Sequence, residues 1–230
     1  MNLSLMKIEF ADKPSAAKLL TRLSAELYDP LTGVGFKDLD LESSGYVSGY
    51  AAKRRPIFVK VFDVNEGKVV EREEFLLSES FFRLDLENGM AEIYAGPRDA
   101  KYAADVFVET VDNDVRLTPS SESVASLLQA MRSSRDSYEI TALDISEFVA
   151  ERGVIGNYSI RTIDAAKGWN FLDKYGPQIK GATVSRVDIG LQAVIHLLGS
   201  GRFRFSVRPK SSVSELASSI KSLVVETGRR

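Results

Sequence analysis

Apolar residues follow two periods along this chain, and the period changes several times. In residues 36–95 they alternate with polar residues, and turn signals such as Asn88-Gly89 interrupt the alternation. That pattern is typical of strands joined by tight turns, so it predicts an antiparallel meander. After Pro14, after Pro97 and near Pro119 the apolar residues have helical spacing instead, which predicts three helices with proline near their first turns.

The second half of the chain shows the same mixture of patterns. Residues 138–145 and 158–163 predict strands, and Asp164 is well placed to cap a following helix. Residues 132–137 are polar and without period, so we expect them to link the two halves. Strands and helices that alternate in this way, with hairpin turns between the strands, predict an α+β fold.

The two halves share an outline. At one fixed offset Gly89 matches Gly201 and Pro97 matches Pro209, and both segments show strand, glycine turn, strand, proline and helix in that order. One interpretation is an internal repeat, and the other is that any two hairpin–helix units share this outline. We expect two related antiparallel sheet units with helices packed on one face. The first is residues 1–135, with extra strands, and the second is residues 136–230.

The end of each half resembles a known family. Residues 194–205 are VIHLLGSGRFRF, and Pro209 and a helical pattern follow. This segment resembles the strand–Ser-Gly–strand–helix close of a TATA-binding-protein repeat, and residues 82–111 resemble the same unit. The resemblance covers about 30 residues in each half. It implies a curved sheet with helices on one face and DNA as a partner, although the first half departs from the family in its extra strands.

Composition excludes several classes of function. The chain has no cysteine and one histidine, His196, so disulfides, thiolate metal sites, a cysteine nucleophile and a histidine-rich metal site are impossible. The net charge of −2 gives no general attraction to polyanions, so such a partner requires a local basic patch. No apolar run approaches the ~20 residues of a membrane span, and the first residues lack the basic region of a signal peptide. We expect a cytoplasmic protein with no membrane partner and no cofactor.

The strand predicted at residues 202–208 has the most informative charge pattern. Alternation places three apolar residues on its core side: Phe203, Phe205 and Val207. It places three arginines on the opposite face: Arg202, Arg204 and Arg208. Guanidinium groups are forked donors that suit phosphate or carboxylate, so this face is a candidate site for an anion or nucleic acid. The alternative is a solvated face, or one paired across the sheet with acids such as Glu92.

A second basic cluster is the triplet Lys53, Arg54 and Arg55. It comes directly before Pro56, so we expect it at a strand end or turn. Such triplets are often solubilising surface. Together with the arginine strand and the tail Arg229-Arg230, it could follow a phosphate backbone if the folded chain brings the three together.

Two other features could take part in chemistry. His196 lies in an apolar strand, which is more typical of a hydrogen-bonded structural residue than of a catalytic base. Two acidic clusters resemble exposed strand edges, where charge discourages aggregation, and the first of them could hold a divalent ion. They are Asp38, Asp40 and Glu42, and Glu71, Glu73 and Glu74.

The sequence carries no catalytic, metal or cofactor signature, and it favours a non-enzymatic binding protein. The leading hypothesis is recognition of nucleic acid or an acidic protein surface through the arginine strand. The alternative is a protein-interaction or structural subunit that forms homo-oligomers, with solvated arginines. A metal-dependent nuclease or hydrolase is the third hypothesis.

Overall fold

The computed structural model describes residues 1–111, 114–151, 154–188 and 191–228. Within these ranges the chain forms five α-helices and eleven strands, which confirms the predicted α+β class. The strands are β1 (Asn2–Phe10), β2 (Val34–Leu41), β3 (Val47–Asp63), β4 (Lys68–Asp85), β5 (Met90–Tyr94), β6 (Val115–Pro119), β7 (Tyr138–Glu151), β8 (Val154–Arg161), β9 (Ile179–Asp188), β10 (Leu191–Leu197) and β11 (Arg202–Arg208). The helices are α1 (Ala16–Ala25), α2 (Pro97–Thr110), α3 (Val124–Ser133), α4 (Ala165–Tyr175) and α5 (Val213–Gly228).

The chain divides into two compact units. The N-terminal unit is residues 7–117, and the C-terminal unit is residues 118–230 together with residues 1–6. The chain therefore passes between units inside β1 and inside β6, whereas the sequence placed the division after residue 135. A boundary inside a strand carries no polar or flexible signal, which is why composition did not mark it.

The helix predicted near Pro119 begins later than expected. Val115–Pro119 forms strand β6, and α3 begins at Val124. Ser123 caps α3, because its hydroxyl accepts a hydrogen bond from the backbone N–H of Ser126 at 3.0 Å. Proline is tolerated at the end of a strand as well as in the first turn of a helix, so Pro119 alone did not distinguish the two.

The N-terminal unit is a sheet with helix α2 on one face and a long hairpin. Its strand order is β2-β3-β4-β5-β1. Apolar residues of β4 and β5 pack under α2, and the residues at this contact are Phe82, Leu84, Ala91, Ile93, Ala103 and Phe107. Strands β3 and β4 pair without interruption from Val47 opposite Leu84 to Asp63 opposite Lys68. β2 accompanies β3 only as far as Lys53.

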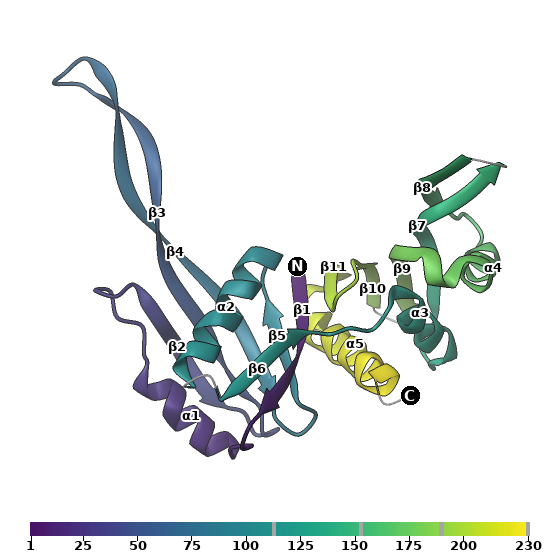
Figure 1. Cartoon of the computed structure of the whole chain (residues 1–230), viewed down its shortest axis with the longest axis horizontal. Coiled ribbons are helices and arrows are strands. Elements are labelled where there is room, and N and C mark those ends of the chain that lie inside the picture. Colours follow the sequence, from purple (N-terminus) through teal and green to yellow (C-terminus); the bar gives the residue numbers. More distant parts are fainter. Residues whose placement is uncertain (112–113, 152–153, 189–190, 229–230) are drawn as a thin grey trace. The chain divides into compact units, whose positions relative to one another are not determined.

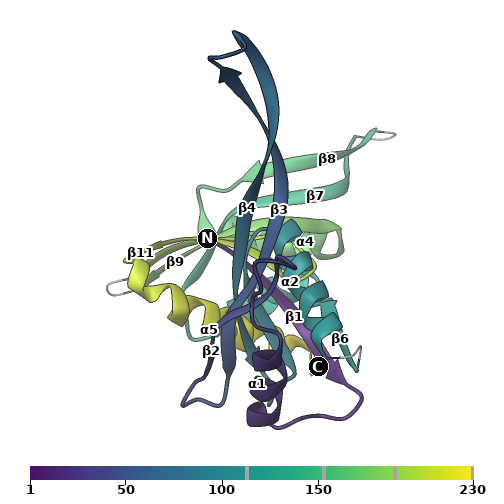
Figure 2. The ribbon, with the colours of Figure 1, turned by 90° about the vertical axis from the view of Figure 1, so that its left-hand side faces the viewer.

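The outer half of this hairpin is a ribbon of two strands, here called the arm and defined as residues 54–77. Figures 1 and 2 show β3 and β4 leaving the rest of the N-terminal unit as a twisted pair. No third strand pairs with residues 54–77 in the described part of the chain. Neither edge of the arm is therefore extended by a further strand.

The C-terminal unit has the strand order β1-β11-β10-β9-β7-β8. Helix α5 covers one face of this sheet. Arg186 of β9 shows which face it is, because its Nη1 donates to the Ser219 hydroxyl of α5 at 3.4 Å. Arg186 lies opposite Ala193 of β10, which in turn lies opposite Val207 of β11. Phe203 and Phe205 share this face, and both are buried.

The two hairpin glycines matched in the sequence occupy the same position in their units. Gly89 and Gly201 have φ values of 62° and 67°, which favour glycine. The carbonyl of Gly89 accepts from the N–H of Ile8 at 2.8 Å, and the carbonyl of Gly201 accepts from the N–H of Leu5 at 2.7 Å. Each hairpin therefore contacts β1 in the same way within its own unit, which supports the internal repeat.

Candidate functional site

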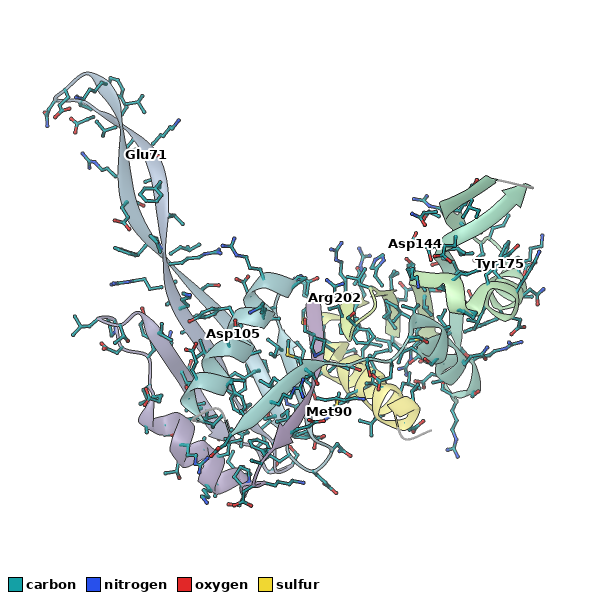
Figure 3. All side chains as sticks on the ribbon, viewed as in Figure 1. Glu71, Met90, Asp105, Asp144, Tyr175 and Arg202 are labelled. Atoms are coloured by element: carbon teal, nitrogen blue, oxygen red, sulfur yellow. The ribbon has the colours of Figure 1, made fainter. Side chains whose placement is uncertain are left out.

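Strand β11 has the two faces that its sequence predicts. Phe203 and Phe205 are 2% and 3% exposed, whereas Arg202, Arg204 and Arg208 are all exposed. Alternation is strict here because α5 covers one side of the sheet and leaves the other free. We call the side with the three arginines the arginine face. Figure 3 labels Arg202 on this strand.

Neighbouring strands add polar groups to the arginine face. Arg204 lies directly opposite His196 of β10, and His196 lies opposite Thr183 of β9. The Nδ1 atom of His196 and the Thr183 hydroxyl are 3.1 Å apart and share a hydrogen bond. His196 is therefore held in place by a neighbour, as expected for a structural histidine, and it lies on the arginine face rather than in the core.

The arginines of this face lack the carboxylate partners that structural arginines have. Arg204 and Arg208 form no ion pair in the described residues, and Arg202 only approaches the Gly199 carbonyl with its Nε, at 3.5 Å. Arg186, on the helix-covered face, is the opposite case. It is 6% exposed and pairs with Asp136 at 3.0 Å and Asp188 at 2.5 Å.

The basic triplet at 53–55 lies inside a strand, so the prediction of a strand end or turn was wrong. β3 runs without interruption through Lys53, Arg54, Arg55 and Pro56. Pro56 is tolerated because β3 has only one neighbour at this point, so its missing N–H removes no bond from a central ladder.

The triplet does not form one patch. Its side chains alternate between the two faces of the ribbon. Lys53 lies over the ring of Tyr102 of α2 at 4.1 Å, whereas Arg54 lies over the ring of Phe75 at 4.3 Å. The triplet belongs to the N-terminal unit and the arginine face to the C-terminal unit. The tail Arg229-Arg230 is outside the described residues.

The acidic clusters do not form a metal site. Asp38 has a φ of 49° within a β-bulge between Lys37 and Asp40, and the bulge breaks the alternation on which the first cluster depended. Glu42 is committed to an ion pair with Arg83. In the described ranges no three acidic or histidine side chains lie close enough to hold a metal ion.

A buried ion network around Arg83 was not predicted from the sequence. Arg83 donates to both carboxylate oxygens of Glu42, from Nε at 2.9 Å and Nη2 at 2.7 Å. Its Nη1 lies 3.7 Å from Glu92, which is fully buried and accepts from the Tyr94 hydroxyl at 2.6 Å. Arg83 also lies over the ring of Tyr46. A polar residue every second position in β4 and β5 was the available signal, but it does not distinguish burial from exposure.

Contacts within the network shift the pKa values of its members. The Arg83 hydrogen bond lowers the pKa of Glu42, and the Glu42 hydrogen bond raises the pKa of Arg83. Burial and the charge of Glu92 raise the pKa of Tyr94. Glu42 and Arg83 therefore stay charged and Tyr94 stays neutral at neutral pH, which indicates a structural role.

An open hollow of about 390 Å³ lies in the C-terminal unit between β7, β8 and β9. Asp144 lines it and accepts a hydrogen bond from the Ser159 hydroxyl at 2.5 Å. Asn157, Tyr158 and Lys180 contribute to its lining. The sequence did not indicate it, because its residues come from three strands and no single segment has a motif.

No protein-family model and no curated protein sequence matches this chain. No helix in the described ranges is long and apolar enough to cross a membrane.

Proposed function

We propose that this chain is a non-enzymatic nucleic-acid-binding protein that holds a phosphate backbone on the arginine face of its C-terminal unit. The observation that carries the proposal is the set of three exposed arginines, Arg202, Arg204 and Arg208, on the sheet face away from α5. None of the three has a carboxylate partner in the described residues. Exposed guanidinium groups without partners are available for charge-assisted bonds to phosphate oxygens.

Spacing along β11 suits an extended anionic chain. Arg202 and Arg204 are two residues apart, or roughly 7 Å along the strand, and Arg208 lies roughly 13 Å beyond Arg204. His196 and Thr183 lie beside Arg204 and offer further hydrogen-bonding groups. A row of donors of this length can contact several phosphates of one strand.

Beyond its guanidinium groups and His196, the arginine face offers few platforms on which bases could stack. Its neighbouring strand β10 exposes Val194, which is 37% exposed, and no exposed aromatic side chain. Aromatic rings are the usual platforms for stacked bases, and the bases of a duplex are read only from within its grooves. The expected binding is therefore to the phosphate backbone, without sequence preference. With a net charge of −2, this attraction is local and sensitive to salt.

The test is fluorescence anisotropy with labelled single-stranded and duplex oligonucleotides at several salt concentrations. Three phosphate contacts predict a slope of log K against log salt of about −2 for single strands and about −2.7 for duplex. Affinity should then fall roughly 15- to 40-fold for a fourfold rise in salt. Arg202→Ala/Arg204→Ala should bind at least about tenfold more weakly, because each charge-assisted bond is worth about 1.5–3 kcal/mol.

A matched control removes the same charge elsewhere. Arg135 and Lys167 are exposed residues of the same unit and belong to no ion pair in the described residues. Arg135→Ala/Lys167→Ala should therefore bind like the wild type. The proposal fails if micromolar protein shows no binding at low salt, or if both double variants lose affinity equally. If poly-glutamate competed for the protein as strongly as an unlabelled oligonucleotide does, the arginine face would be assigned to acidic proteins instead.

A further inference from the structure

One face of the arm carries exposed apolar side chains, and one of them, Phe75, lies under the Arg54 guanidinium. Alternation and the β3–β4 register place the same five apolar side chains on one face of the ribbon. They are Phe58, Phe62, Val69, Phe75 and Leu77, which are 67%, 59%, 61%, 54% and 40% exposed. We call this surface the arm face. Figure 3 shows side chains projecting from both sides of the ribbon, with Glu71 labelled on it.

A two-stranded ribbon of this length is marginal by itself in water. Such hairpins gain stability when a further layer packs on them. A contiguous exposed apolar surface in a folded protein usually marks an interaction site. The arm face is both part of a two-stranded ribbon and an exposed apolar surface, and its charges indicate which partner fits it.

The charges of the arm face separate by strand. On this face the β3 strand carries Arg54 and Lys60, and the β4 strand carries Glu71 and Glu73. None of these four forms an ion pair among the described residues. The two glutamates disfavour a nucleic acid on this surface. A row of one sign beside a row of the other sign is instead complementary to a copy of itself.

A two-fold axis running along the ribbon makes this complementarity explicit. It places β3 of one arm over β4 of the other, residue by residue along the printed register. Lys60 then lies over Glu71 of the second copy, and Phe62 lies over Val69 of the second copy. Each contact occurs twice, as in any isologous interface.

The available area is consistent with a dimer. The exposed parts of the five apolar side chains amount to roughly 500 Å² per chain, given the 150–250 Å² that a large side chain buries. A standard interface buries about 800 Å² per partner, and the charged side chains of the arm face supply the remainder. A dimer formed by pairing of strand edges is less suitable. Pro56 lacks the N–H that an added strand would bond on β3, and acidic residues lie along β4.

We propose that the arm face is a homodimer interface in which two copies of this chain pack their arms face to face. The measurement is the mass in solution by analytical ultracentrifugation at micromolar concentration. Wild-type protein should show twice the chain mass of 25.4 kDa. Phe58→Ser/Phe62→Ser should show the chain mass itself. Glu74→Lys, on the opposite face of the same strand, should remain dimeric.

Charge reversal tests the register of the two copies. Lys60→Glu places two acids against each other in its own dimer, and Glu71→Lys places two lysines against each other. Each variant alone should therefore be monomeric. An equimolar mixture restores opposite charges at both contacts and should form a dimer containing one chain of each kind.

Several results would overturn the proposal. A wild-type monomer at all concentrations would remove the interface, and a dimer that survives Phe58→Ser/Phe62→Ser would place it elsewhere. A mixture of the two charge variants that stays monomeric would reject the two-fold arrangement. Because the arm residues are exposed, circular dichroism of each variant should match the wild type, which separates loss of pairing from misfolding.

Discussion

Replacing Arg83 by methionine removes the cation of a buried network and keeps a side chain of similar shape. In the wild type this guanidinium bonds both oxygens of Glu42 and lies 3.7 Å from Glu92. The side chain of Glu92 has no exposed surface and accepts a hydrogen bond from the Tyr94 hydroxyl. Arg83→Met takes this cation away from two carboxylates, and one of them, Glu92, is fully buried. We therefore expect a large loss of stability in the N-terminal unit.

The size of the loss follows from the burial of each member. Removing one partner of a buried ion pair costs about 3–5 kcal/mol, because the remaining charge is left without compensation. The Arg83 side chain is 14% exposed and that of Glu42 is 27% exposed, so water relieves part of the cost. The expected loss is about 3 kcal/mol. For a unit of this size it corresponds to a fall in Tm of roughly 10 °C.

Urea unfolding followed by circular dichroism measures the loss, and hydrogen exchange of β4 and β5 peptides locates it. Arg116→Met, an exposed arginine of the same unit, is the control and should change stability by less than about 0.5 kcal/mol. Glu92→Gln should restore part of the loss in the Arg83→Met background, because it removes a buried negative charge that the guanidinium no longer faces. A cost below about 1 kcal/mol, the range of exposed pairs, or no recovery by Glu92→Gln would refute the reasoning.

Two further changes have definite outcomes. Arg83 lowers the pKa of Glu42 below its ordinary 4.5. Ionised Glu42 therefore stabilises the fold above pH 4.5, and this contribution to stability is lost as the pH falls through the lowered pKa. Urea titrations from about pH 5 to pH 3 should show a steeper loss of stability in the wild type than in Glu42→Gln. Gly201→Ala should destabilise the C-terminal unit by at least about 2 kcal/mol, since its Cβ would meet the Leu5 carbonyl oxygen at 2.4 Å. Gly67→Ala, at a similar φ in open space, should cost roughly 1 kcal/mol; thermal unfolding compares the two.

The parts of the fold that sequence reasoning predicted are those in which one side is buried. β11 alternates cleanly because α5 covers Phe203 and Phe205 and leaves the arginines free. The hairpin glycine at 201 was predicted for the same kind of reason, since its φ of 67° favours one residue type. In both places a local pattern records a local constraint.

The parts that were missed depend on how far neighbouring strands extend. β3 continues for ten residues beyond Lys53, where its pairing with β2 stops. Pro56 and the basic triplet look like the end of a strand only if the strand belongs to a layered sheet. The Arg83 network was missed for a related reason, because Glu42 comes from outside β4 and β5, and no spacing along the chain joins it to Arg83.

The exposed side chains of the two units suit different kinds of partner. The arginine face is basic and carries no exposed aromatic ring, whereas the arm face has three exposed phenylalanines beside balanced charges. One surface therefore favours a polyanion, and the other favours a surface like itself. A dimer through the arms carries two arginine faces, so a nucleic acid long enough to reach both would be held more tightly without any new contact. Substitutions at Phe58 and Phe62 leave every arginine of β11 in place, so their effect on long but not short oligonucleotides separates this gain from the affinity of a single face.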